Sequence, residues 1–280
     1  MRIDAHQHFW QYQFEQYPWI DEKMARLRGD FLPEQLTELL SANDFNGCVV
    51  VQARQLDRET QWLLSLGAHN PQILGVVGWI DLCSAQLPEK LSKLQSQPLL
   101  KGFRHVLQDE LEIDYMLRPE FIRGLKWLAE FDYSFDLLVT AEQLPIVCQL
   151  LEQLPKMRIV LDHIGKPSFT ADGWQHWAQS IQELAKYPHL YCKVSGLVTE
   201  ADWDNWSAVQ FAPYLEHILN CFGAKRLMFG SDWPVCLVAA NYVDAVSLIE
   251  QFIAKHALQD LPGVMGENAV EFYKLTSRDV

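Results

Sequence analysis

The sequence predicts a (β/α)8 barrel, and three observations support this fold class. Short runs of β-branched and apolar residues alternate with longer stretches of helical periodicity along all 280 residues. We count eight such runs, and eight βα units in about 250 residues is the usual size of a closed parallel barrel. No linker rich in proline, serine or glycine divides the chain, so we expect one domain over residues 1–280. An open, doubly wound sheet is the structural alternative, but its Gly-x-Gly-x-x-Gly and phosphate-loop motifs are absent.

The expected strands are short and apolar, and most of them end in polar residues. They cover residues 2–7, 48–53, 73–80, 100–106, 134–139, 158–163, 190–195 and 226–231.

Helix candidates follow these strands and have recognisable first turns or apolar faces. Pro33 and Pro119 can each occupy the first turn of a helix, where the missing N–H of proline is not needed. Leu36, Leu39 and Leu40 then form one apolar face of the first helix. The other expected helices cover residues 60–68, 88–95, 141–154, 175–186, 209–221 and 240–255.

A long aromatic connection, residues 9–30, follows the first strand. It contains Phe9, Trp10, Tyr12, Phe14, Tyr17 and Trp19, with Phe31 directly behind it. Such a segment is too aromatic for a solvated linker, and in a barrel it would lie at the mouth where the strands end. We expect either part of a lid over a site or an aromatic plug that closes the end of the barrel.

Composition excludes several classes of partner. The formal net charge of -13, from 36 acidic and 23 basic residues, argues against nucleic acid or an anionic membrane as the partner. Apolar runs are far shorter than the about 20 residues that span a bilayer, and the first residues have no signal-peptide pattern. The six cysteines are scattered without a Cys-x-x-Cys motif, which favours reduced thiols. We expect an acidic cytoplasmic enzyme that acts on a small molecule, and no pattern indicates an oligomeric state.

The first strand contains the first candidate site residues. Alternation in an extended strand places Asp4, His6 and His8 on one face, and Ile3 and Ala5 on the other. Neutral imidazole is a common metal ligand and a general acid or base. Two histidines on one face of a strand end therefore indicate a catalytic or metal site.

Polar side chains also follow the other expected strands, at the end where a barrel builds its site. A single such residue is usually a satisfied surface side chain, but their coincidence at one end of the barrel indicates function. For Asp81, Asp162 and Ser195 we prefer a structural interpretation, as caps or supports of the helices that follow. The remaining candidates are Gln52, Arg54, Trp79, Arg104, His105, His163, Lys193, Asp232 and Trp233.

Six short motifs resemble one known family. They are Asp-Ala-His-Gln-His-Phe-Trp at 4–10, Gly-Phe-Arg-His at 102–105, Leu-Asp-His-Ile-Gly-Lys-Pro at 161–167, Lys-Val-Ser-Gly-Leu at 193–197, Phe-Gly-Ser-Asp-Trp-Pro at 229–234 and Gly-Glu-Asn-Ala-Val-Glu-Phe-Tyr at 266–273. Together, over residues 4–275, they resemble the lactone-hydrolysing branch of the amidohydrolase superfamily. That branch includes sugar lactonases and, more distantly, 2-pyrone-4,6-dicarboxylate lactonase. The resemblance implies a barrel hydrolase that opens a cyclic ester at the barrel mouth.

The resemblance also implies roles for residues. An aspartate at the position of Asp232 would act as general base for the attacking water. His163, Arg104 or His105 would donate hydrogen bonds to the lactone carbonyl, and Lys193 would assist there or neutralise the growing charge.

Substrate contacts are expected from other residues of the mouth. Arg54, Lys193 and Gln52 would bind hydroxyl groups, and Trp10 or Trp233 would offer a flat apolar face to the sugar. A dicarboxylate lactone would require more arginines than the expected mouth contains. The expected substrate is therefore a neutral aldonolactone.

Metal binding is left open by the residues. Superfamily members with a full metal site carry a histidine after strand five and a lysine or glutamate after strand four. Residues 134–140 contain no histidine, and strand four ends in Arg104 and His105 instead. A guanidinium cannot ligate a cation, so a two-metal centre is not expected. One divalent ion such as zinc on His6, His8 and Asp232, with or without His163, is compatible with the sequence, whether or not catalysis requires it.

Two other functions are alternatives. The first is a metal-dependent amidohydrolase or decarboxylase on the same barrel, and the absent strand-five histidine counts against it. The second is a non-catalytic sugar-binding barrel, and the retention of Asp232 with the histidines at 6, 8 and 163 counts against that.

Overall fold

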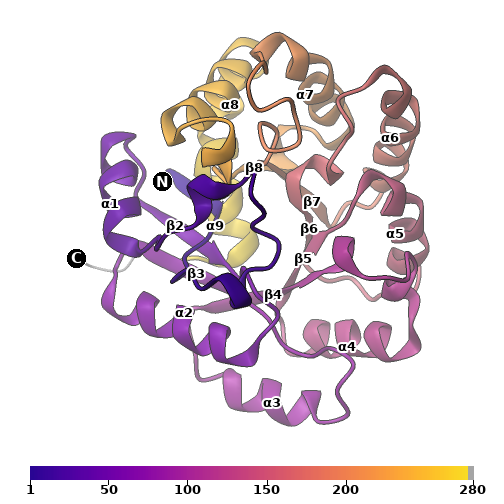
Figure 1. The fold of residues 1–280 in the computed structure, drawn as a ribbon. Helices are drawn as coiled ribbons and strands as arrows, with labels where there is room; N and C mark the ends of the chain where they lie inside the picture. The colour runs from indigo at the N-terminus through magenta and orange to yellow at the C-terminus, as the bar shows by residue number, and fades with distance from the viewer. Residues whose placement is uncertain (277–280) are drawn as a thin grey trace.

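Eight parallel strands form a barrel in the computed structural model, which describes residues 1–276 except the side chains of residues 171 and 172. The strands pair in chain order from the first to the eighth (Figure 1). Their bounds are β1 (Ile3–Gln7), β2 (Gly47–Val51), β3 (Ile73–Gly78), β4 (Leu100–Val106), β5 (Ser134–Leu138), β6 (Ile159–Leu161), β7 (Leu190–Val194) and β8 (Leu227–Phe229).

The segment after β8 returns to β1 and closes the ring. Gln7 and Trp233 form a parallel bridge. The His8 N–H donates to the Trp233 carbonyl at 2.7 Å, and the Asp232 N–H donates to the His6 carbonyl at 2.8 Å. The chain segments that carry His6, His8 and Asp232 are therefore hydrogen-bonded to each other.

Helices surround the ring, as the (β/α)8 prediction requires (Figure 1). The predicted 141–154 helix is shorter, because a 3-10 turn at Ala141–Gln143 precedes its α-helical part. The helix near the C-terminus was not predicted. The bounds are α1 (Pro33–Ala42), α2 (Asp57–His69), α3 (Leu87–Leu94), α4 (Pro119–Glu130), α5 (Leu144–Leu151), α6 (Ala171–Leu184), α7 (Ala208–Phe222), α8 (Tyr242–His256) and α9 (Asn268–Tyr273).

Apolar side chains form two separate layers. One layer lies between the strands and the helices and includes Phe103, Leu161 and Phe229. The other lies inside the ring, where residues such as Val49 and Val77 pack against α9. The short α9 also contacts β1 and β8, so it closes the inside of the barrel at the end opposite the site.

A β-bulge in β1 changes the expected alternation. Asp4 pairs with Cys48 and Gln7 pairs with Val50, so β1 advances three residues while β2 advances two. Asp4 faces outward and accepts hydrogen bonds from the Ser231 hydroxyl at 2.6 Å and the Tyr242 hydroxyl of α8 at 3.1 Å. The prediction that Asp4 shares a face with His6 was therefore wrong. Burial raises the pKa of Asp4 to about 6, although its hydrogen bonds act in the opposite direction.

The aromatic loop, residues 9–31, is closed on itself and packed. Trp10 and Phe31 exchange two backbone hydrogen bonds of 3.0 and 2.9 Å, which bring its ends together. Trp10 is fully buried and packs against Tyr17, Trp19 and Phe31. The expected aromatic plug is present, and the loop crosses the mouth of the barrel in Figure 1. Among the described residues, no helix is long and apolar enough to cross a bilayer.

Replacing Gly230 should disturb the position of His6. A Cβ at Gly230 would lie 2.5 Å from the His6 Cβ and 3.1 Å from its backbone nitrogen. We expect Gly230→Ala to lower the free energy of unfolding by about 1–3 kcal/mol, the usual cost of overpacking, measured by urea denaturation. Gly29→Ala is the matched control, because no atom lies within 4 Å of its added Cβ. An unchanged denaturation midpoint in Gly230→Ala would contradict this close packing of Gly230 against His6.

Candidate active site

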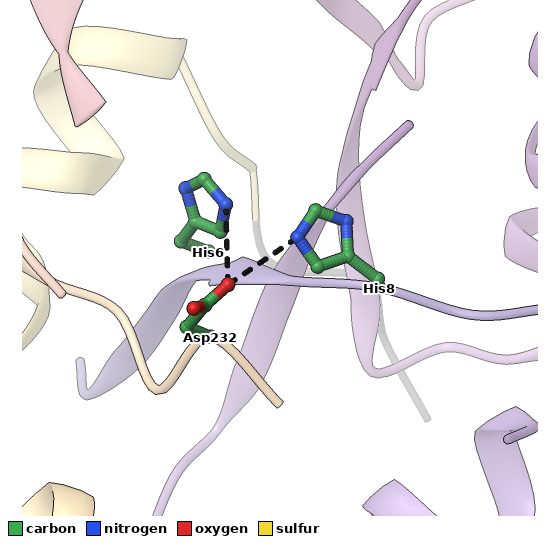
Figure 2. Close-up of side chains that lie close together, drawn as sticks. All are labelled: His6, His8 and Asp232. Atoms are coloured by element: carbon green, nitrogen blue, oxygen red, sulfur yellow. Dashed lines mark ion pairs between the residues drawn. The ribbon is translucent and has the colours of Figure 1, made fainter. Parts of the chain in front are cut away.

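Three buried side chains meet at the closure between β1 and β8 (Figure 2). Asp232 Oδ1 lies 3.5 Å from His8 Nε2 and 3.8 Å from His6 Nε2. The two imidazole centroids are 5.0 Å apart. Asp232 has a left-handed backbone with φ of 58°, an uncommon conformation that often marks functional positions.

His163 joins this group from the turn after β6. Its backbone is also left-handed, with φ of 52°, which ends the strand two residues earlier than predicted. Its ring centroid lies 4.5 Å from that of His6, and its Nδ1 lies 2.9 Å from the Ser195 hydroxyl. Gly196 has φ of +67°, and a Cβ there would be 2.5 Å from His163 Nδ1. The β7–α7 connection is therefore shaped around this imidazole.

Arg104 of β4 also contacts this group of side chains. Its Nη1 lies 3.2 Å from Asp162 Oδ2 and 3.2 Å from His6 Nε2, and its Nη2 donates to the Gln52 carbonyl at 2.5 Å. His6 Nδ1 lies 3.4 Å from Asp162 Oδ1. His6 Nε2 is therefore placed to accept from Arg104, while its Nδ1 faces the Asp162 carboxylate.

A layer of charged side chains lies beneath His6, inside the barrel. The Lys193 ammonium lies 2.5 Å from Asp136 Oδ2, 3.1 Å from Asp162 Oδ1 and 3.1 Å from His6 Nδ1. Tyr273 of α9 donates its hydroxyl to Asp136 Oδ2 at 2.7 Å. All of these residues are fully buried. Lys193 therefore neutralises aspartates beneath the site, and the structure does not place it where it could bind a substrate hydroxyl.

The two aspartates of this layer differ in their proton affinity. Burial raises the pKa of Asp136 despite the nearby ammonium of Lys193. For Asp162, burial is outweighed by Lys193, His6 and Arg104, which hold its pKa well below the ordinary value. Asp162 is thus the carboxylate that balances the positive charge next to His6.

The protonation states above this layer suit general-base chemistry. Burial, followed by the Lys193 charge, lowers the pKa of His6 well below its ordinary value, and burial also lowers the pKa of His163. Burial alone would raise the pKa of Asp232, but His163, His8 and His6 hold it below the ordinary value. At neutral pH the site therefore presents a carboxylate beside neutral imidazoles.

A cavity of about 760 Å³ opens above this group. His8, Arg104, His163 and Asp232 line its floor, and residues of the aromatic loop, including Gln16 and Trp19, line one wall. The loop is therefore both a packed plug and a wall of the cavity. This size is within the usual range of about 300–1,000 Å³ for small-ligand sites.

Five predicted substrate or catalytic residues do not line this cavity: Lys193, which lies beneath it, and His105, Gln52, Trp10 and Trp233. His105 lies on the opposite face of β4 from Arg104, with its Nε2 2.6 Å from Glu110 and its ring stacked on Tyr115 at 5.3 Å. Strand alternation explains this placement, because neighbouring residues point to opposite faces. Gln52 is buried and donates to the Arg104 carbonyl, while Trp10 and Trp233 are packed within aromatic clusters.

Arg54 lines the cavity, and two of its donor nitrogens bind residues outside the cavity floor. Its Nε donates to Glu59 Oε2 at 2.6 Å, its Nη1 donates to Gln16, and its guanidinium lies 4.9 Å from the Tyr17 ring centroid. Glu59 is fully buried. Arg54 therefore connects the aromatic loop to the start of α2.

Three site residues have roles that the sequence interpretation missed. Asp162 binds Arg104 and Lys193, and Ser195 binds His163, so each holds a site side chain, whereas we expected caps or supports of the helices that follow. Asp136 was overlooked, although a carboxylate within the apolar run of β5 was a usable signal. Asp81, in contrast, accepts a hydrogen bond from the Cys83 N–H, as a local turn residue does.

Removing Arg54 should loosen the aromatic loop. We expect Arg54→Ala to raise the rate of trypsin cleavage at the exposed Lys23, Arg26 and Arg28 by at least about tenfold. Hydrogen bonds to charged groups stabilise by about 1.5–3 kcal/mol, so their loss should raise the equilibrium population of the open loop that trypsin cleaves. Mass spectrometry of timed digests measures the cleavage. Arg118→Ala removes a different ion pair, with Glu112, and is the control; equal cleavage of both variants would mean that Arg54 does not hold the loop.

Comparison with known proteins supports a family assignment. A family model described as amidohydrolase matches residues 3–275. An L-fucono-1,5-lactonase from Burkholderia multivorans is 40% identical, with 98% of this chain and 96% of that protein covered. An L-fucono-1,5-lactonase from Burkholderia ambifaria is 34% identical with the same coverage. A crystal structure of an amidohydrolase from Burkholderia multivorans with bound zinc has a TM-score of 0.95 and 40% identity, covering 99% of this chain and 100% of that one. The chain belongs to the amidohydrolase family.

Proposed function

We propose that this protein is a lactonase that hydrolyses the cyclic ester of a neutral sugar lactone. The observation that carries the proposal is the convergence of the Asp232 carboxylate, the His163 imidazole and the Arg104 guanidinium on the floor of one cavity. The relatives named L-fucono-1,5-lactonase, which align along nearly the whole chain, support the substrate class.

Asp232 would remove a proton from the attacking water. It is ionised at neutral pH and can accept a proton, although its lowered pKa makes it a weaker base than an ordinary aspartate. As the water oxygen bonds to the carbonyl carbon, negative charge develops on the carbonyl oxygen. Arg104 and His163 line the same floor and would donate hydrogen bonds to that oxygen. The Ser195 hydroxyl can donate to His163 Nδ1, which leaves the proton on Nε2 for this purpose.

Ring opening would return the proton. When the tetrahedral intermediate collapses, the bond between the carbonyl carbon and the ring oxygen breaks. Asp232, now a carboxylic acid with a low pKa, protonates the leaving alkoxide and is restored as a carboxylate. The acid product ionises in solution, so each turnover releases one proton. This proton release provides a direct assay.

A neutral substrate agrees with the charges around the cavity. Arg54 is paired with Glu59, and Arg104 is paired with Asp162. Lys193 is enclosed below the floor. Since these cations are already neutralised, they do not form the free cationic cluster that a dicarboxylate lactone would require.

The donor set fits one divalent ion. His8 Nδ1 lies 2.8 Å from the Val51 carbonyl, an acceptor, so with its proton on Nδ1 His8 would offer the Nε2 lone pair to an ion held beside Asp232. The ligand atoms of His6, His8 and Asp232 all lie within 4.8 Å of one another. A bound ion would supply Lewis acidity toward the carbonyl or an acidified water. Arg104 competes with it, because its Nη1 contacts His6 Nε2. We propose zinc as an occupant of these three residues without assigning it a required step.

Replacement of the general base should abolish most activity. We expect Asp232→Asn to lower kcat for lactone hydrolysis by at least about a hundredfold, because general-base catalysis is typically worth 10²–10⁴-fold. The measurement is proton release over a panel of fresh aldono-1,4- and 1,5-lactones, with the spontaneous rate subtracted. Asp204→Asn, on an exposed carboxylate, is the matched control. Near-normal turnover in a folded Asp232→Asn variant would reject the assigned role.

Zinc should stabilise the protein through the three proposed ligands. We expect one equivalent of Zn²⁺ added to chelator-treated protein to raise Tm, because an ion that binds only the folded state stabilises that state. His8→Ala should lose the shift, whereas His69→Ala, on an exposed histidine, should keep it. An equal Tm shift in His8→Ala would place the zinc elsewhere.

A further inference from the structure

We propose that the outer part of the cavity is a second sugar subsite, and that the protein hydrolyses lactones of oxidised disaccharides as well as those of single sugars. This inference rests on the proposed lactonase function. It adds a substrate class, the aldobionolactones, in which the lactone ring carries a glycosyl group.

The first observation is the size of the cavity. A six-carbon aldonolactone has at most about twelve non-hydrogen atoms. Even if each atom filled the roughly 30 Å³ that a water molecule occupies in the liquid, the ring would fill only about 360 Å³. The cavity measures about 760 Å³, so about half of it is left over. A second sugar ring has the size to occupy that remainder.

The second observation is a gradient of burial from floor to mouth. His8, Arg104, His163 and Asp232 on the floor are at most 5% exposed. Toward the mouth, the lining residue Arg58 is exposed, while Trp19 and Glu200 are half-buried. The lactone carbonyl must reach the floor to meet Asp232. A substituent on the far side of the ring would then extend between the outer residues.

The third observation is the chemistry of the outer wall. Trp19 lines the cavity, and its indole is held by a perpendicular contact with Trp10 at 5.7 Å. A flat indole suits the C–H surface of a pyranose, and planar polar side chains suit its hydroxyls. Gln108, Asp109 and Glu200 supply such polar groups around the same space.

The charges of the outer wall favour a neutral substituent. Lys166 and Glu200 form an ion pair of 2.8 Å. The other charged residues that line the cavity above its floor are Arg54, Arg58, Glu15 and Asp109. Because Arg54 and Lys166 are already paired with carboxylates, and Glu15 and Asp109 also face the cavity, a phosphate or a uronic acid would meet more repulsion than attraction. A neutral glycosyl group would not.

The chemistry is the same for both substrates. Water adds its oxygen to the lactone carbonyl, the bond to the ring oxygen breaks, and that oxygen takes the proton held by Asp232. The glycosidic bond is untouched, and the products are one aldobionic acid and, after ionisation, one proton. No further reactant is required.

The test compares pairs of fresh lactones with the same lactone ring, with and without a 3-, 4- or 6-O-glycosyl group. Proton release gives kcat/KM after subtraction of the spontaneous rate. For each ring that is hydrolysed unsubstituted, we expect at least one glycosylated partner to react with a kcat/KM at least as high. If the unsubstituted lactones turn over and every glycosylated partner reacts only at the spontaneous rate, the second subsite is wrong and the lactonase function stands. If none of the lactones is hydrolysed, both proposals are wrong.

Variants of residues in the outer cavity test whether these residues bind the glycosyl group. We expect Trp19→Ala to lower the ratio of kcat/KM for glycosylated over unsubstituted lactone by at least about fivefold, and Trp19→Phe to lower it less. Glu200→Gln, which preserves the shape of the side chain, should also lower the ratio. Glu183→Gln removes an ion pair between Glu183 of α6 and Lys186, and it should leave the ratio unchanged. A ratio in both Trp19→Ala and Glu200→Gln equal to that of the unmodified protein would overturn the proposal.

Discussion

The buried ion pairs around Lys193 are the interaction on which the site depends. An ammonium enclosed in a barrel is costly unless carboxylates and hydrogen bonds compensate for its lost hydration. Asp136 and Asp162 provide the carboxylates, and Tyr273 of α9 supplies a further hydrogen bond to Asp136. These residues come from β5, β7, α9 and the turn after β6. The layer can therefore form only when the barrel is closed and α9 is in place.

This layer determines the charge state of the proposed catalytic groups above it. Asp162 and Lys193 contact His6 Nδ1, and Arg104 contacts His6 Nε2, so both sides of the ring are held by charged partners. The resulting neutral imidazole leaves Asp232 as the carboxylate that faces the cavity. The aromatic loop adds the remaining wall, and Arg54 connects it to α2. The buried ion pairs thus lie beneath the cavity, and the aromatic loop, held by Arg54, forms one of its walls.

Much of the fold was predictable because the hydrophobic pattern of a barrel is repetitive. The eight runs and their helices were confirmed, with errors at the strand ends. The ends of β6 and β8 were placed too far along, and after β6 the left-handed residues His163 and Ile164 break the strand. Nothing in a sequence pattern reports such backbone conformations. The bulge in β1 was not predictable either. Its single extra residue places Asp4 on the opposite face from His6.

The candidate site was predictable to the extent that strand ends meet at one rim. His6, His8, Arg104, His163 and Asp232 do lie together in the structure. A position near a strand end does not determine which way the side chain points. His105 is at the end of β4, but it faces Glu110 and not the cavity.

Partners distant in the chain matter as much for the site. Lys193, which we expected to bind substrate, pairs with Asp136 and lies inside the barrel. Such pairings depend on which charged side chains face each other inside the barrel, and apolar periodicity does not specify this.

The most direct test is a crystal structure of the protein with an aldonolactam, in which a ring nitrogen replaces the labile lactone oxygen. The account predicts that the lactam carbonyl oxygen lies at hydrogen-bond distance, about 2.7–3.2 Å, from both Arg104 and His163, with Asp232 facing the carbonyl carbon. A lactam bound with its carbonyl directed away from these residues, or seated outside the cavity, would contradict it.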